Sequence, residues 1–256
     1  MILLYRIIPF AIAADVALGF LVVLTWRTHL FVAMVLAVVI AMLLFARLVG
    51  FTPRHLRFWM LTSTPLVFFA SSFLLLLFLE SPTAMAVLAG ITTLFVFFFA
   101  EHVFAYVHLP ATYQAYSIEH FSLVLNVCSV FFLSTAGFGA RLFYQGDAPL
   151  WFLSTLFFLA AFFTILSTFW ASKVDVRRSM AYALGGAVFA AELFCAVTYL
   201  PTNFLSGGAF IALAVYLFLG LTRATIMDTL TPRLAKQYVA AGIVFSLIIF
   251  GTAQWV

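Results

Sequence analysis

Charged residues are scarce in this chain. Only 8% of its 256 residues are Asp, Glu, Lys or Arg, whereas soluble domains carry about 25%. Hydrophobic residues make up 66%, and Phe alone occurs 33 times. A soluble fold of this size has too little interior to hide so much apolar surface. The composition therefore excludes soluble enzymes, nucleic-acid-binding modules and disordered linkers, and it indicates an integral membrane protein that crosses the bilayer several times.

Metal-binding and catalytic motifs are also missing. The two cysteines, Cys128 and Cys195, lie inside apolar runs and belong to no CxxC or Cys/His cluster, so we interpret them as small core residues. The sequence has no HExxH or ExxH spacing, no Gly-rich phosphate loop and no recognisable nucleophile–base pair. It therefore identifies no cofactor, and it does not favour an enzyme.

What the sequence does contain is a series of long apolar runs. A bilayer core about 30 Å thick needs roughly 20 apolar residues in a helix. Pro, Gly, Asn and Asp punctuate the sequence between such runs, for example at Ser81-Pro82 and Thr231-Pro232. We predict an all-α bundle that occupies the whole chain as one transmembrane domain, with nine spans near residues 7–26, 29–49, 57–79, 83–107, 117–143, 150–171, 177–199, 204–226 and 235–255.

The basic residues predict the orientation of the nine spans. Ten of the 12 Lys and Arg residues fall on one side of the membrane, and Arg27 and Arg141 fall on the other. The positive-inside rule places the first group in the cytoplasm. We therefore expect a cytoplasmic N-terminus and an external C-terminus, in a plasma or inner membrane. The cytoplasmic Lys and Arg loops should attract anionic lipid headgroups rather than nucleic acid.

Two segments of the sequence resemble each other. Ala100-Glu101 is followed after seven residues by Leu109-Pro110, and Ala191-Glu192 is followed after seven residues by Leu200-Pro201. Together with similar landmarks elsewhere, this spacing suggests three units of three helices, near residues 1–81, 82–172 and 173–256. Because three is odd, successive units would be inverted, as repeats often are in secondary transporters. The alternative is chance similarity within a restricted apolar alphabet.

Two acidic residues fall inside predicted spans. Asp15 lies near the middle of the first span and Glu192 about two-thirds through the seventh. A carboxylate in hydrocarbon costs several kcal/mol unless it is paired or protonated, so both side chains should face the bundle interior. They could bind a proton, a cation or a cationic substrate. Equally, they could be hydrogen-bonded carboxyls that lock helices together.

A denser polar cluster lies around the loop between the fourth and fifth spans. Its position predicts an interfacial belt of aromatic and imidazole rings, and its histidines could also bind a metal or sense pH. No metal is assigned to it. The candidate side chains are Glu101, His102, His108, Glu119 and His120.

A polar stripe continues from this cluster along the fifth span. Glu119, Ser122, Asn126 and Ser129 repeat at helical spacing and so share one face. Such a stripe could line a hydrated path that begins at the cytoplasmic surface. With the buried acids, Asn126 therefore completes the candidate substrate- or ion-binding residues.

Three functions are compatible with these features. The first is a transporter or channel-like protein for a small solute or ion that uses the buried carboxylates Asp15 and Glu192. The second is a structural subunit of a larger membrane complex, because the chain has broad apolar surfaces and no strong motif. The third is a membrane-embedded enzyme acting on lipids or isoprenoids through Glu101 and Glu119.

Overall fold

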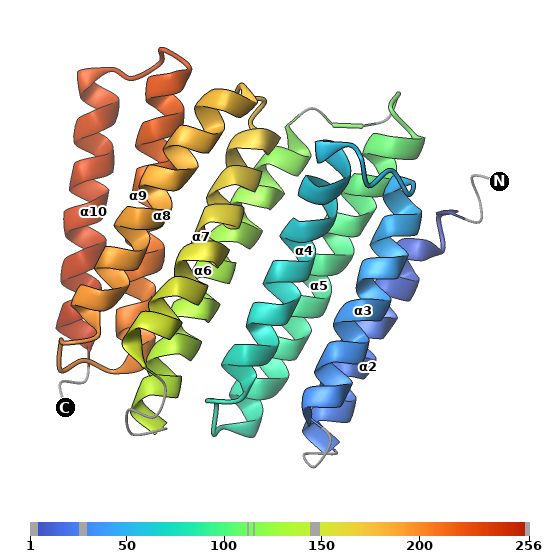
Figure 1. The fold of residues 1–256 in the computed structure, drawn as a ribbon, viewed down its shortest axis with the longest axis horizontal. Coiled ribbons are helices and arrows are strands. Elements are labelled where there is room, and N and C mark those ends of the chain that lie inside the picture. Colours follow the sequence, from blue (N-terminus) through green and yellow to red (C-terminus); the bar gives the residue numbers. More distant parts are fainter. Residues whose placement is uncertain (1–4, 26–29, 112, 115, 144–148, 254–256) are drawn as a thin grey trace. The chain divides into compact units, whose positions relative to one another are not determined.

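The protein is built from long helices in the computed structural model, which describes residues 5–25, 30–111, 113–114, 116–143 and 149–253 (Figure 1). Within these ranges, nine helices are long and apolar enough to cross a membrane. The prediction of an all-α integral membrane protein with nine spans is confirmed. The helices are α2 (Ile8–Thr25), α3 (Leu30–Val49), α4 (Leu56–Leu76), α5 (Pro82–His108), α6 (Ser117–Phe143), α7 (Leu150–Ala171), α8 (Val176–Val197), α9 (Phe204–Ile226) and α10 (Pro232–Thr252).

Helix starts coincide with the punctuation in the sequence. Ser81 and Thr231 each precede a proline, and each hydroxyl oxygen accepts a hydrogen bond from the backbone N–H three residues later. Asp175 caps α8 by accepting from the N–H groups of Arg177 and Arg178. A capping oxygen satisfies N–H groups that have no partner inside the helix, and proline fits the first helical position because it lacks an N–H. Local chemistry therefore sets where these spans begin.

The chain divides into two compact units, residues 1–125 and 126–256, and the division falls within α6. The predicted boundaries near residues 81 and 172 lie elsewhere. The three inverted repeats therefore stay a prediction.

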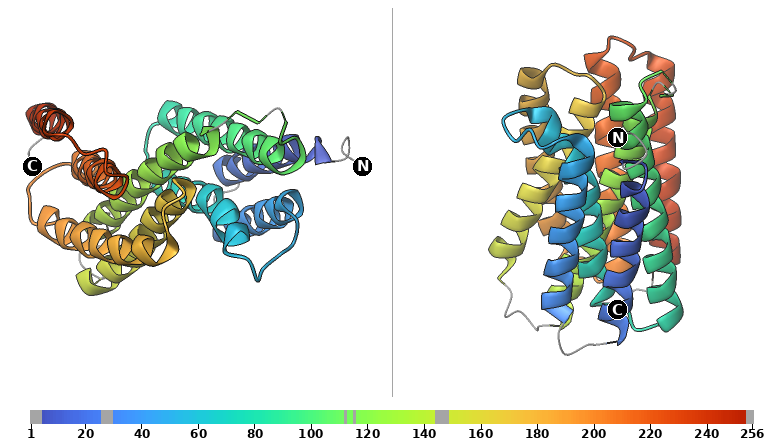
Figure 2. Two further views of the ribbon diagram at one scale, coloured as in Figure 1. Left: turned by 90° about the horizontal axis from the view of Figure 1, so that it is seen from above. Right: turned by 90° about the vertical axis from the view of Figure 1, so that its right-hand side faces the viewer.

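The first unit contains a four-helix bundle of α2 to α5. Helix α2 packs against α3 and α5, and α4 packs against the same two helices (Figure 2). Its core is rich in phenyl rings, with Phe20 against Phe69 and Phe73 at centroid distances of 6.0 and 4.6 Å. A Cβ on Gly19 would come within 2.9 Å of the Ala37 Cβ. The absence of that Cβ lets α2 and α3 approach closely, as small residues commonly do in membrane helices.

The second unit contains α7 to α10 and the rest of α6. Helix α7 packs along α8, α8 along α9, and α9 along α10, which lies at the edge of this unit (Figures 1 and 2). Phe194 of α8 stacks between Phe138 of α6 and Phe157 of α7, at centroid distances of 4.6 and 4.9 Å. These rings join three helices at one level of the unit.

Candidate functional sites in the two units

Asp15 lies on the inner face of α2. Its neighbours Ile12 and Val16 are fully buried, and the Asp15 side chain itself is half-buried. One carboxyl oxygen, Oδ2, is shielded from the surface and has no hydrogen-bond partner among the described residues. The expectation that this acid faces the bundle interior agrees with its surroundings. The missing partner distinguishes it from a carboxyl that ties two helices together by hydrogen bonding.

Thr92 of α5 is a second buried polar group in the same unit. Its side chain is fully buried, and its hydroxyl has no hydrogen-bond partner in the described part of the chain. Helices α2 and α5 run antiparallel, because Tyr5 contacts His108 and Phe10 contacts Phe97. Five residues beyond the Phe10–Phe97 contact, α2 reaches Asp15 and α5 reaches Thr92. The two unsatisfied groups therefore lie at a similar depth in the bundle.

The two histidines of α5, His102 and His108, each make a hydrogen bond and a ring contact. A nitrogen–oxygen distance of 2.7 Å indicates that the Nδ1–H of His102 donates to the carbonyl oxygen of Phe98, and the ring packs on Phe121 at 4.5 Å. His108 donates from Nε2 to the carbonyl oxygen of Leu48 over 3.0 Å and stacks on Tyr5 at 4.4 Å. Both imidazoles therefore connect neighbouring segments of the first unit.

The remaining members of that cluster differ in burial. Glu101 is half-buried and His120 is exposed, whereas Glu119 is only 5% exposed. Within the ranges that the structure describes, no three His, Cys, Asp or Glu side chains are grouped so that they could hold a metal ion.

The predicted polar stripe occupies a buried face of α6. Glu119, Ser122, Asn126 and Ser129 are between 0% and 5% exposed. In the second unit, the Asn126 amide nitrogen donates to Ser167 Oγ and to Thr168 Oγ1 of α7, both at 2.8 Å. The Asn126 oxygen Oδ1 is buried and has no hydrogen-bond partner among the described residues. Asn126 therefore uses both of its hydrogens and keeps one free acceptor.

Thr135 marks a further close contact in the second unit. A Cβ on Gly208 of α9 would overlap the Thr135 hydroxyl oxygen, and it would lie 3.2 Å from the Thr135 backbone nitrogen. The Thr135 hydroxyl also lacks a hydrogen-bond partner in the described residues. Gly208 therefore allows α9 to approach α6 at a polar position.

Glu192 does not occupy the position that we expected. Its side chain is exposed, and it lines a shallow groove between α7 and α8 with neighbours that include Ser154, Thr155 and Cys195. The inward faces of α8 are instead occupied by small and aromatic residues, such as Ala187, Ala191 and Phe194, which pack the close α7–α8 contact. The expectation that Glu192 faces the bundle interior is therefore wrong. Its groove includes neither Asp15 nor Asn126.

Comparisons with known proteins add a family but no chemistry. One family model matches residues 8–252, from the first residue of α2 to the last of α10. The chain belongs to the family DUF5656. That family is described as a protein of unknown function. No curated protein and no solved structure matches the chain. Because the DUF5656 match covers all nine helices, the family is defined by the whole membrane domain, and function has to be argued from geometry.

Sequence reasoning missed several polar groups of this DUF5656 chain. Thr92 is one threonine in a long apolar run, and nothing in its spacing distinguishes it from Thr93. The partners of Asn126 carried a clearer signal. Thr164, Ser167 and Thr168 recur at helical spacing in an otherwise apolar run, a pattern that predicts one polar face on α7.

Proposed function

We propose that this protein transports a proton or a small monovalent cation, and that Asp15 is the binding group. Support comes chiefly from one observation, the buried Asp15 Oδ2 that has no hydrogen-bond partner among the described side chains. A buried polar atom without a partner is costly, and ionisable groups inside membrane bundles commonly mark ion pathways and proton relays. A transported ion would supply the missing partner.

Thr92 of the neighbouring helix α5 would complete the binding site. The Thr92 hydroxyl lies at a similar depth and can accept or donate a hydrogen bond. Ile12 and Val16, which lie near Asp15 on α2, are apolar and fully buried. A binding site with so few polar groups would suit a proton or a bare cation better than a large polar solute.

Asn126, Glu101 and Glu119 are further proposed contributors to transport, whereas the exposed Glu192 is not. Asn126 offers a free buried oxygen in the second unit, and Glu119 lies on the same polar stripe. The histidines His102, His108 and His120 are proposed as interfacial groups, because two of them are held by backbone and ring contacts. The orientation with a cytoplasmic N-terminus is also proposed, on the ten-to-two division of basic residues.

The test of this proposal is ion flux into liposomes that contain the purified protein. Replacing Asp15 with Asn keeps the shape of the side chain and removes its ability to carry a charge. We expect Asp15→Asn to reduce flux of H⁺ or Na⁺ to the level of empty liposomes, and Asp15→Glu to keep measurable flux. Asp228→Asn is the matched control, because Asp228 is a loop acid with φ of 55°, a conformation that Asn also tolerates.

Folding has to be separated from transport in this experiment. Thermal unfolding of each purified variant shows whether Asp15→Asn is still folded. Unchanged flux in a folded Asp15→Asn variant would contradict the assignment of Asp15 as the binding group.

A subunit role is the second candidate, and α10 favours it. Gly242 is the one described residue within α10 that is buried, and the helix exposes large side chains such as Ile243, Phe245 and Leu247. Lipid tails can cover this surface, and so can a helix of another membrane protein. We propose such a partner only as the alternative to independent transport.

A further inference from the structure

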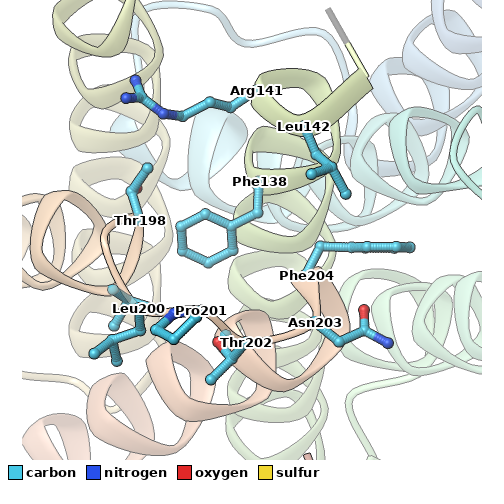
Figure 3. A pocket seen from close by; sticks show the side chains of 11 residues that line it. Phe138, Arg141, Leu142, Thr198, Leu200, Pro201, Thr202, Asn203 and Phe204 are labelled. Carbon is cyan, nitrogen blue, oxygen red and sulfur yellow. The ribbon is translucent and has the colours of Figure 1, made fainter. Parts of the chain in front are cut away.

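A hollow lies at one end of the second unit, where α6 and α8 end and α9 begins. Its volume is about 580 Å³. Figure 3 shows Phe138 in the middle of the hollow, with Thr198 on one side, Phe204 on the other and Arg141 at the rim. None of the candidate residues for transport lines it, so it is a separate feature from the proposed transport site.

Among the described residues that line this hollow, the charged one is Arg141, in the last turn of α6. Its side chain is half-buried, and none of the described residues that line the hollow is a carboxylate. Thr198, Thr202 and Asn203, between the end of α8 and the start of α9, add hydroxyl and amide groups to the lining. The described part of the lining therefore presents one positive charge together with neutral hydrogen-bonding groups.

The start of α9 adds to this positive character. Asn203 caps the helix by accepting a hydrogen bond from the Leu205 N–H over 3.2 Å. The first turn of a helix carries partial positive charge on its N–H groups. Together with the Arg141 guanidinium, this charge favours an anion in the hollow.

The inner surface of the hollow is apolar. Phe138 stacks flat on Phe194, at 4.6 Å and an interplanar angle of 9°. A Cβ on Gly207 would lie 3.0 Å from the Phe138 ring and 3.1 Å from Val197, so the glycine keeps α9 close to this floor. A free, fully hydrated anion gains little binding free energy from such an apolar surface. The acyl part of an amphiphile gains more, because contact with this surface removes it from water.

The position of the hollow relative to the helix ends indicates which kind of amphiphile could bind there. Three helices of membrane-spanning length begin or end at it, so it lies near the level where phospholipid headgroups meet the hydrocarbon core. Arginine matches phosphate oxygens through its planar fork of N–H groups. We propose that this hollow binds the phosphate of an anionic phospholipid, with Arg141 as the charged contact and the Phe138 floor against the glycerol and upper acyl region.

The test is binding of phosphatidylglycerol to the purified full-length protein in detergent, measured by native mass spectrometry across a lipid titration. Two further probes separate the parts of the ligand. Diacylglycerol has the acyl chains without the phosphate, and glycerol 3-phosphate has the phosphate without the chains. Arg141→Gln removes the charge, Arg141→Lys keeps it, and Arg223→Gln is a control at the other end of α9.

We expect the wild-type protein to bind phosphatidylglycerol more tightly than either probe. Arg141→Gln should weaken that binding about tenfold, the size of one charge-assisted contact. Arg223→Gln should stay within about threefold of wild type, and Arg141→Lys, which keeps the charge but lacks the planar fork, should bind with an affinity between those of wild type and Arg141→Gln. Equal binding of diacylglycerol, or no effect of Arg141→Gln in a folded protein, would overturn the proposal. Equally tight binding of glycerol 3-phosphate would replace the lipid with a free phosphate ester.

Discussion

At the scale of the residue, Asn126 is a polar group that is only half satisfied. Its two amide hydrogens bind Ser167 and Thr168, and its oxygen has no hydrogen-bond partner in the described structure. Interhelical hydrogen bonds in membranes contribute about 0.6 kcal/mol each. We expect Asn126→Leu to lower the free energy of unfolding by about 1 kcal/mol, because it removes two such bonds. Equilibrium unfolding in mixed micelles would measure the change.

Val127→Leu is the control for this experiment, because it changes volume on the same helix and removes no hydrogen bond. A loss of more than about 3 kcal/mol in Asn126→Leu would contradict the expectation. Such a loss would mean that the Asn126 oxygen also holds a tightly bound water or ion, which adds bonds of its own.

Single residues were also the hardest to predict from the sequence. Asp15 could be identified because an acid inside an apolar run always requires an explanation. Glu192 met the same criterion and lies on the outside of α8, because tight packing of α7 against α8 leaves no room on the inner face. Thr92 gave no signal, since a threonine can satisfy its hydroxyl within its own helix and the sequence does not reveal when it fails to do so.

At the scale of the element, close helix contacts depend on particular glycines. Gly208 lies against Thr135, whereas a Cβ added to Gly90 of α5 would have no neighbour within 4 Å. We expect Gly208→Ala to destabilise the protein by about 1–3 kcal/mol, because the added methyl group would push α9 away from α6. Gly90→Ala should leave stability unchanged or slightly increase it. Thermal unfolding of both variants measures the difference, and equal midpoints would contradict it.

Helix positions themselves followed closely from the sequence. The eighth predicted span, residues 204–226, coincides with α9, because Asn203 supplies a cap and an apolar run follows it. The third predicted span was less accurate, since α4 ends at Leu76 and Leu77 to Leu79 continue as tighter turns. Hydropathy does not distinguish an α-helix from the turn that extends it, so that boundary could not be predicted.

At the scale of the whole molecule, the two candidate functions differ in whether the protein binds a partner protein. Native mass spectrometry on gently extracted protein reports partner chains and bound lipids together. If the protein transports ions by itself, we expect a monomer or homo-oligomer that carries phospholipid. A stoichiometric second protein, bound through the exposed surface of α10, would contradict independent transport and support the subunit role.

The membrane class and the number of spans could be predicted for the whole chain, because both depend on composition and on the length of apolar runs. The division into two units within α6 could not. Which helices group together depends on side-chain packing between distant segments, such as Phe138, Phe157 and Phe194, and the spacing of residues along one helix does not specify its partners.

The His108 ring restrains how the first unit can move. It bonds to the Leu48 carbonyl oxygen near the end of α3 and stacks on Tyr5, just before α2. Three segments are therefore pinned at the same end of the bundle. If Asp15 alternates between access to the two sides of the membrane, α2, α3 and α5 would have to tilt while these His108 contacts hold them together at one end. The larger displacement would then occur at the opposite end of these helices, near Thr25 of α2 and Pro82 of α5.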